Sequence, residues 1–212
     1  MCVVAALVLL AGAPFVVNAA PVEASMGTVS RIFYFHVPAA MLTLSSSIVC
    51  GLASLAFLAT RRPGTDRVAL AAAELVVVFG LIVLVTGPLW ARKAWGVWWV
   101  WEPRLVMTLV MWMVFVAYLM LRRFGGPGAE VLAAAVGLFG MAISPFVYVS
   151  VNLWRTMHPS TNVLPSLPGS MARPLWYCVA AFTCLYVGLL LTRVRVERAQ
   201  TALEEAFLAL ED

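Results

Sequence analysis

The chain contains only two histidines, and each lies within two residues of a proline, in "RIFYFHVPAAM" (His36) and "LWRTMHPSTN" (His158). A protein zinc site needs three or four ligands, and no cysteine or carboxylate cluster accompanies this pair. Two imidazoles are, however, a suitable pair of axial ligands for a haem iron. The residues therefore favour bis-histidine ligation of a haem, and two unrelated histidines at a membrane surface are the alternative.

Between the histidines lies "WGVWWVWEPRL", which has four tryptophans within seven residues. If this stretch is helical, Trp95, Trp98 and Trp99 spread over about 100° of one face. Trp101 widens that face and Glu102 falls within it. The pattern predicts a broad indole platform in the plane of the membrane interface, on which a porphyrin could stack. The alternative is an aromatic belt, because tryptophan is enriched at bilayer interfaces.

Charged residues flank this stretch. Glu102 precedes Pro103, and proline is favoured in the first turn of a helix. We therefore expect Glu102 at or near a helix N-cap, with a mainly structural role and electrostatic tuning of the site as the alternative. The basic residues expected on the same side include Arg31, Arg104 and Arg155. Their guanidinium groups could bind porphyrin propionates, or they could be ordinary interfacial anchors.

The composition indicates which elements must position these residues. The chain is 63% hydrophobic and 11% charged, with a mean hydropathy of +0.97, whereas soluble domains are about 45–50% apolar and about 25% charged. An all-α integral membrane protein is expected, because single strands cannot satisfy their backbones in lipid. Six apolar runs approach the roughly 20 residues that cross a bilayer: 3–20, 39–60, 68–88, 104–121, 129–150 and 174–192.

These runs predict a six-span membrane domain over residues 1–192, followed by an amphipathic helical tail, 193–212, that is either solvated or docked to a partner. The short basic turns 61–67 and 122–128 are typical of cytoplasmic loops. Both termini are then cytoplasmic, and the connections that hold the histidines and the Trp-rich stretch (89–103) lie outside.

Three further features carry expectations. The first apolar run has no basic residue before it, which favours a retained span over a cleaved signal peptide, and a shortened N-terminus is also considered. Glu74 lies in the third run, where snorkelling toward the cytoplasmic surface is expected. The four cysteines lie in apolar runs and are expected to be small core residues.

In "WGVWWVWEPRL", "FHVPAAM" and "WRTMHPS" the chain resembles the haem exporter protein C family of the bacterial cytochrome c maturation system. These are cytochrome c assembly proteins with a Trp-rich WWD domain between two external histidines. The resemblance covers nearly the whole chain. It implies haem b bound at the outer face of the bacterial inner membrane, with His36 and His158 as axial ligands and with Trp95, Trp98, Trp99 and Trp101 as the platform. The family's usual aspartate after the last tryptophan is replaced here by Glu102.

The resemblance also implies a haem-transport role without catalysis, together with several partners. These are the permease and ATPase subunits of an ABC-type transporter, a small single-span membrane subunit and a periplasmic haem chaperone. The related haem lyases carry a further histidine pair within the membrane, which this chain cannot supply. A secondary transporter, with its polar groups at mid-membrane, and a b-type cytochrome for electron transfer are the alternative functions.

Overall fold

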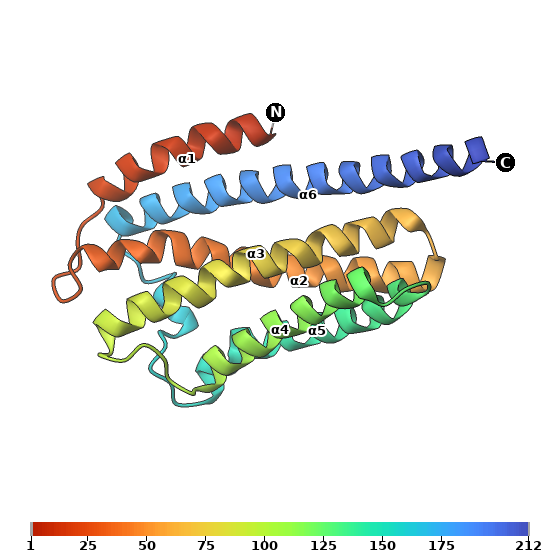
Figure 1. Ribbon diagram of the computed structural model, residues 1–212. Helices are drawn as coiled ribbons and strands as arrows, with labels where there is room; N and C mark the ends of the chain where they lie inside the picture. Colours follow the sequence, from red (N-terminus) through yellow and green to blue (C-terminus); the bar gives the residue numbers. More distant parts are fainter. Residues whose placement is uncertain (1, 212) are drawn as a thin grey trace.

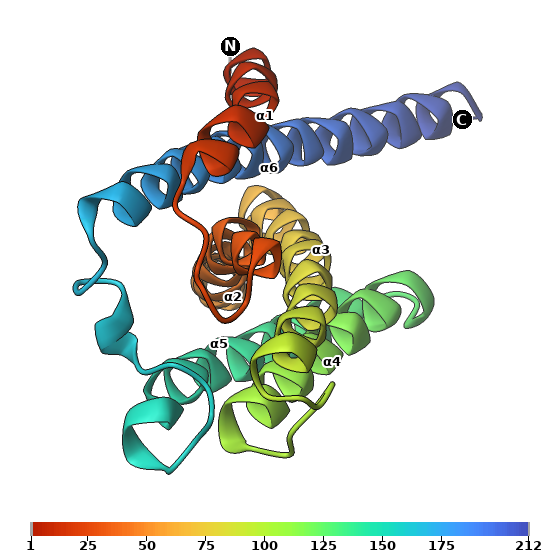
Figure 2. The ribbon, with the colours of Figure 1, turned by 90° about the vertical axis from the view of Figure 1, so that its left-hand side faces the viewer.

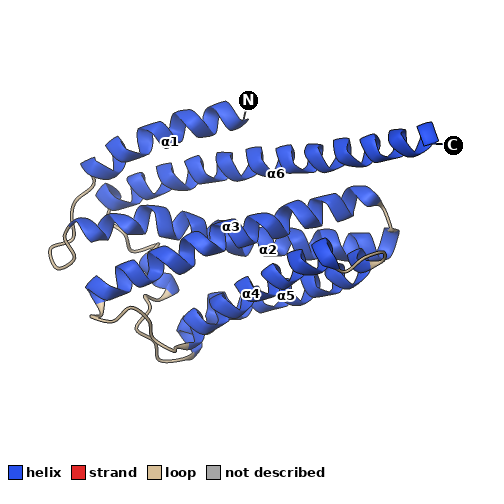
Figure 3. Cartoon of the chain, viewed as in Figure 1, coloured by secondary structure: helices blue, strands red, loops and turns tan. Residues whose placement is uncertain are grey.

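A computed structural model describes residues 2–211, and within this range it contains helices and no strand (Figures 1 and 3). The helices are α1 (Cys2–Ala19), α2 (Phe33–Thr60), α3 (Pro63–Ala94), α4 (Pro103–Phe124), α5 (Ala129–Leu153) and α6 (Gly169–Glu211), with short 3₁₀ segments η1 (Thr28–Ile32) and η2 (Thr161–Val163). The last five of these α-helices are long and apolar enough to cross a membrane, and α1 is apolar but shorter. The protein is therefore an all-α integral membrane protein, as predicted.

The helices form three tiers, which are seen end-on in Figure 2. Helix α1 packs on α6, α2 packs on α3, and α4 packs on α5. The α2–α3 pair lies in the middle, because α2 also contacts α5 and α6 while α3 also contacts α4 and α6. Residues carried by the middle pair can therefore meet residues from both outer tiers.

Tight packing and an apolar exterior both fit a membrane bundle. A Cβ added at Gly140 would stand 2.6 Å from the Phe115 ring, so glycine allows α4 and α5 to approach closely. Large apolar side chains such as Leu52, Phe139 and Phe146 are exposed on the outside of the bundle. An apolar exterior of this kind is stable against lipid and not against water.

The connections gather at two ends of the bundle (Figure 1). The short turns at 61–62 and 125–128 lie at one end. At the other end lie the segment 20–32, the Trp loop (residues 95–102) and the strap (residues 154–168) that joins α5 to α6. The two histidine regions and the Trp loop therefore share one end, as the sequence predicted.

Ion pairs tie the helices together toward the short-turn end. Arg122 of α4 donates two hydrogen bonds of 2.8 Å to Asp66 of α3. Arg193 of α6 donates bonds of 2.6 and 2.9 Å to Glu74 of α3. The Glu74 side chain is 30% exposed, and its carboxylate is paired with a guanidinium from the neighbouring tier. Snorkelling of Glu74 toward the cytoplasmic surface stays a prediction.

The helix boundaries extend past the apolar runs. Helix α2 begins at Phe33 and includes Pro38, so His36 is helical, although the sequence placed residues 21–38 in a connection. One missing backbone donor is tolerated in a membrane helix when neighbouring elements pack around it. Helix α6 continues without a break through residues 192 and 193, so the predicted tail is an extension of the last span. Cys50 and Cys178 are buried and free, as expected of core residues.

Candidate functional site

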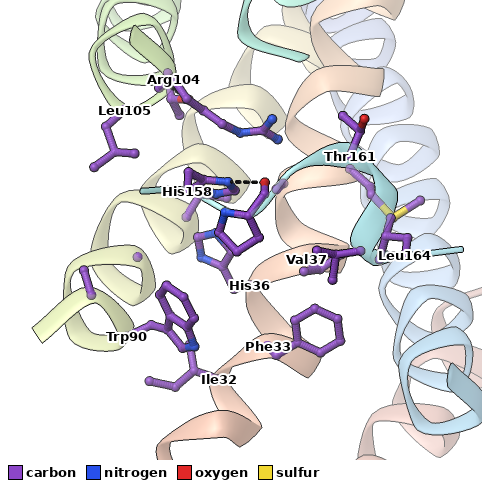
Figure 4. A pocket seen from close by; sticks show the side chains of 18 of the residues that line it. Ile32, Phe33, His36, Val37, Trp90, Arg104, Leu105, His158, Thr161 and Leu164 are labelled. Carbon is purple, nitrogen blue, oxygen red and sulfur yellow. Dashed lines mark hydrogen bonds between the residues drawn. The ribbon is translucent and has the colours of Figure 1, made fainter. Parts of the chain in front are cut away.

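A cavity of about 420 Å³ opens at the end of the bundle that carries the strap and the Trp loop. This volume lies within the range of roughly 300–1,000 Å³ that is usual for small-molecule sites. Its walls are mostly apolar and come from α2, α3, α4 and α5, and the segment 20–32, the strap, the Trp loop and the start of α6 complete them. Both histidines of the chain line it (Figure 4).

His36 projects into the cavity from the first turn of α2. Its Nδ1 lies 2.9 Å from the hydroxyl of Thr86 on α3. The Thr86 hydroxyl donates its hydrogen to the carbonyl oxygen of Ile82 at 2.6 Å. The ring is thus attached to the neighbouring helix of the middle tier.

His158 reaches the same cavity from the strap, which runs from the outer tier at α5 to the opposite tier at α6 and passes the middle pair on its way (Figure 2). Its Nδ1 lies 2.9 Å from the carbonyl oxygen of Pro159, and because a carbonyl only accepts, Nδ1 carries the hydrogen. Burial, together with the positive charge of Arg104, lowers the pKa of His158 to about 4. The ring is therefore neutral at physiological pH.

Both imidazoles thus have Nδ1 engaged, and within residues 2–211 neither Nε2 takes part in a hydrogen bond. A neutral imidazole with Nδ1 protonated has its lone pair on Nε2, which is the form that binds a metal. No group of three or more His, Cys, Asp or Glu side chains suited to a metal ion occurs among the described residues. The donor set therefore suits a metal whose remaining ligands come from a macrocycle.

The Trp-rich stretch is not the predicted helix. Helix α3 ends at Ala94, and Gly96 adopts φ +79°, a left-handed conformation that glycine allows and that breaks the helix. Residues 97–102 then run as bends and irregular backbone. Trp95 and Trp99 line the cavity. Trp98 and Trp101 are not among its lining residues and are 57% and 79% exposed, so the four indoles do not form one platform.

A tryptophan outside the predicted set completes the aromatic wall. Trp90, near the end of α3, lines the cavity and packs edge-on against Trp95, with ring centroids 5.3 Å apart (Figure 4). Its position follows from α3 extending to Ala94, beyond the apolar run that ends at residue 88. Continuing the helical periodicity past that run would have revealed it.

Glu102 is at the N-cap of α4, as predicted, and Pro103 begins the helix. Its side chain makes no capping hydrogen bond. It is only 6% exposed and accepts the backbone N–H of Met157 at 2.8 Å through Oε2. Because Met157 immediately precedes His158, the carboxylate fixes the strap beside the histidine. Glu102 does not line the main cavity, so its position supports the structural role and not direct ligand contact.

The three predicted arginines are separated. Arg104 lines the cavity and donates to the Tyr148 carbonyl oxygen at 3.3 Å, which leaves most of its N–H groups free (Figure 4). Arg31 instead faces α1, where it donates to the Asn18 carbonyl oxygen at 3.3 Å. Arg155 is exposed and borders a separate hollow beside Glu102. Five of the ten predicted site residues thus line the cavity: His36, His158, Trp95, Trp99 and Arg104.

One buried donor in this wall has no partner. The indole Nε1 of Trp99 is fully buried and makes no hydrogen bond to any of the residues that the structure describes. A buried unpaired N–H is costly and indicates a missing acceptor. With Arg104 in the same wall, the cavity offers two kinds of donor to an anionic group and two imidazoles to an iron, so its residues fit a haem.

The family profile of heme exporter protein C matches residues 1–208. The chain belongs to this family. It is 35% identical over 199 residues to the heme exporter protein C of Bradyrhizobium diazoefficiens, covering 91% of this chain and 76% of that protein. The Escherichia coli K12 protein of the same name is 33% identical over 183 residues, covering 83% and 73%. That of Rhodobacter capsulatus is 33% identical over 195 residues, covering 87% and 81%. Membership in this family supports a role in haem export for cytochrome c biogenesis.

Proposed function

We propose that the cavity binds haem b at the outer face of the bacterial inner membrane, and that the chain delivers it to a periplasmic haem chaperone. One observation carries this proposal above the others. The only two histidines of the chain, 122 positions apart (158 − 36), line one cavity with Nδ1 engaged and Nε2 free. Iron in a porphyrin has two axial positions and commonly takes imidazole there.

Each wall of the cavity has a task in this proposal. His36 and His158 supply the axial ligands through Nε2. Trp90, Trp95 and Trp99 supply flat apolar surface for the macrocycle, and the other apolar walls exclude water from it. Arg104 and the free Nε1 of Trp99 hold the propionates, because a guanidinium and an indole N–H both donate to carboxylates. Within this cavity only the bonds to the iron are made and broken, so the proposed role of the chain is binding and delivery and not catalysis.

Delivery requires that the haem can leave. His36 belongs to a packed helix, whereas His158 belongs to the irregular strap at the bundle end. Loops move more readily than the elements that they connect, so the strap side can open toward a soluble partner.

A secondary transporter would need polar groups at mid-membrane that are free to bind its substrate. The hydroxyl groups in the middle of this bundle are instead bonded within the chain, since Ser46 donates to the Ala72 carbonyl oxygen at 2.8 Å and Ser144 is bonded to Ser47. These bonds argue against the transporter alternative.

The partners in this proposal are the permease and ATPase subunits of an ABC-type transporter and a small single-span membrane subunit. In the orientation that we propose, the short basic turns and both termini lie in the cytoplasm. Topology reporters fused after Gly64 and Gly126 should report cytoplasm, and one at Asn162 should report the periplasm. The reverse pattern would place the cavity on the cytoplasmic side and rule out delivery to a periplasmic chaperone.

The decisive experiment is spectroscopy of the purified haem-loaded protein. Wild type should show a low-spin six-coordinate spectrum. His36→Ala or His158→Ala should become high-spin or lose haem, and added imidazole should partly restore occupancy by filling the vacant axial position. A wild-type spectrum in the double variant would show that these histidines are not the ligands. Haem covalently attached to the chaperone in cells, at matched protein levels, then measures delivery and separates it from electron transfer.

A further inference from the structure

Thr86 contacts His36 from the neighbouring helix, and no sequence motif singles it out. It lies within the third apolar run, and its partner is 50 residues away in the chain. The contact joins α2 to α3, the two helices of the middle tier. A side chain that bonds the ring of a candidate iron ligand can control how that ligand is presented.

The hydrogen bonds of Thr86 determine which nitrogen of His36 is protonated. A threonine hydroxyl has one hydrogen to donate. That hydrogen goes to the Ile82 carbonyl oxygen, 2.6 Å away, which can only accept. Toward His36 the hydroxyl oxygen must therefore accept, so Nδ1 of the neutral ring is the donor across the 2.9 Å contact. The Nε2 lone pair is then free.

The ring of His36 also lies close to α3 at Gly87. A Cβ built on Gly87 would stand 3.4 Å from His36 Cε1, so the edge of the ring faces a position of α3 that carries no side chain. The ring is thus bonded to α3 through Nδ1, and this bond is what fixes it. Rotation about its Cα–Cβ bond would break the bond to Thr86.

We propose that Thr86 is a positioning residue that fixes the tautomer and orientation of His36, so that Nε2 faces the bound iron. The ligand role of His36 rests on the proposed function, but the tautomer follows from this chain alone. Thr86 accepts from Nδ1–H and donates to the backbone. The support comes from a helix hydroxyl, whereas the corresponding support of His158 is the Pro159 carbonyl within the strap.

The tautomer can be measured without haem. The chain has two histidines, so protein labelled with ¹⁵N in the histidine rings gives two ring systems by NMR, assigned with His36→Gln and His158→Gln. In the wild type, His36 should be the Nδ1–H form. Thr86→Val, which keeps the shape and removes the acceptor, should convert that ring toward the Nε2–H form and leave the His158 ring unchanged. Thr86→Ser should restore the wild-type pattern.

A matched control is Thr183→Val, because the Thr183 hydroxyl makes the same bond to the carbonyl four residues earlier (Val179, 2.7 Å) but lies exposed on α6, away from the cavity. It should change neither ring. In the haem-loaded protein, Thr86→Val should shift the low-spin signature and weaken haem retention roughly 10- to 100-fold, the usual cost of losing such a support.

The outcomes separate this inference from the proposed function. An Nε2–H ring at His36 in the wild-type apoprotein, or an unchanged ring in Thr86→Val, would overturn the role of Thr86 whatever the haem does. A converted ring with unchanged haem retention would also overturn it. A wild-type haem spectrum in His36→Ala would instead refute ligation by His36, while leaving the measured tautomer intact.

Discussion

Removing the Glu102 carboxylate should loosen the strap beside His158 without changing any side chain that lines the cavity. The contact is a charge-assisted hydrogen bond of 2.8 Å from the Met157 N–H to a side chain that is 6% exposed. Hydrogen bonds to charged groups contribute about 1.5–3 kcal/mol, and roughly 1.4 kcal/mol is a factor of ten. Glu102→Ala should therefore shift the equilibrium between docked and undocked strap by roughly 10- to 150-fold.

Haem retention should fall with the docked fraction, because only a docked strap presents His158 to the cavity. The apparent affinity is the intrinsic affinity multiplied by the competent fraction. Haem retention therefore falls by the full factor only if most of the haem-free variant has its strap undocked. Glu102→Gln keeps an acceptor and loses the charge, so it should retain haem better than Glu102→Ala.

Glu102→Asp tests the length of the side chain. Removing one methylene retracts the carboxylate by about one C–C bond, roughly 1.5 Å. The bond to Met157 would then exceed the range of a hydrogen bond unless α4 or the strap moved. We therefore expect the aspartate variant to behave more like Glu102→Ala than like wild type.

The assay is the haem content and spin state of purified protein, with dissociation followed by transfer to apomyoglobin. Glu205→Gln, a charge removal at an exposed site on α6, is the control and should match wild type. Spectra of Glu102→Ala should gain a high-spin component, because the iron loses the His158 ligand. Hydrogen exchange of the strap amides reports the equilibrium between docked and undocked strap even where the strap stays mostly docked. Exchange rates in Glu102→Ala equal to those of wild type would refute the role assigned to this carboxylate.

Three further predictions follow from the site and the bundle. In the apoprotein, the His158 ring should take up its proton with a midpoint near pH 4 and not near pH 6.5, as followed by an NMR titration. In the unfolded chain His158 would take up this proton near pH 6.5. Because the pKa of the folded state is lower, the contribution of His158 to the free energy of unfolding is retained above about pH 6.5 and is lost as pH falls toward 4. A titration midpoint of the His158 ring near pH 6.5 would contradict its burial. Trp95→Leu should weaken haem retention roughly 2- to 12-fold, from a stacking contribution of about 0.5–1.5 kcal/mol, whereas Trp98→Leu should have no effect, and equal losses would show that the outward indole also binds. Arg122→Ala should destabilise the purified protein by about 1–3 kcal/mol, between the values for exposed and buried pairs, with the exposed neighbour Arg123→Ala as the control in the same thermal unfolding assay.

The helices were predictable because the thickness of a bilayer sets the length of the apolar run that crosses it. An apolar run near 20 residues has few other stable structures, and each predicted run is a helix in the structure. The ends were less predictable, because helices continue into the interface where hydropathy no longer reports on them. Helix α2 takes in His36 and Pro38, and α6 runs on through residue 193.

The lining of the candidate site was predictable where residue type alone carried the signal. Two histidines in a chain of 212 residues are few enough to be paired without knowing the fold. The predicted arrangement of the tryptophans was wrong because α3 ends before Gly96, whose positive φ redirects the chain and changes which indoles line the cavity. The contact of Thr86 with His36 and the hydrogen bond from the Met157 N–H to Glu102 join residues at least 50 positions apart, which local periodicity cannot report.

The two candidate ligands are held by unequal supports, and that difference bears on delivery. His36 is fixed between two packed helices of the middle tier through Thr86. His158 is fixed through its own strap, where the bond from the Met157 N–H to Glu102 can break without unpacking a helix. An electron carrier gains from two rigid ligands, because both keep its haem enclosed. A carrier that must give up its haem gains from one ligand that holds and one that can withdraw, and the placement of these two histidines meets that requirement.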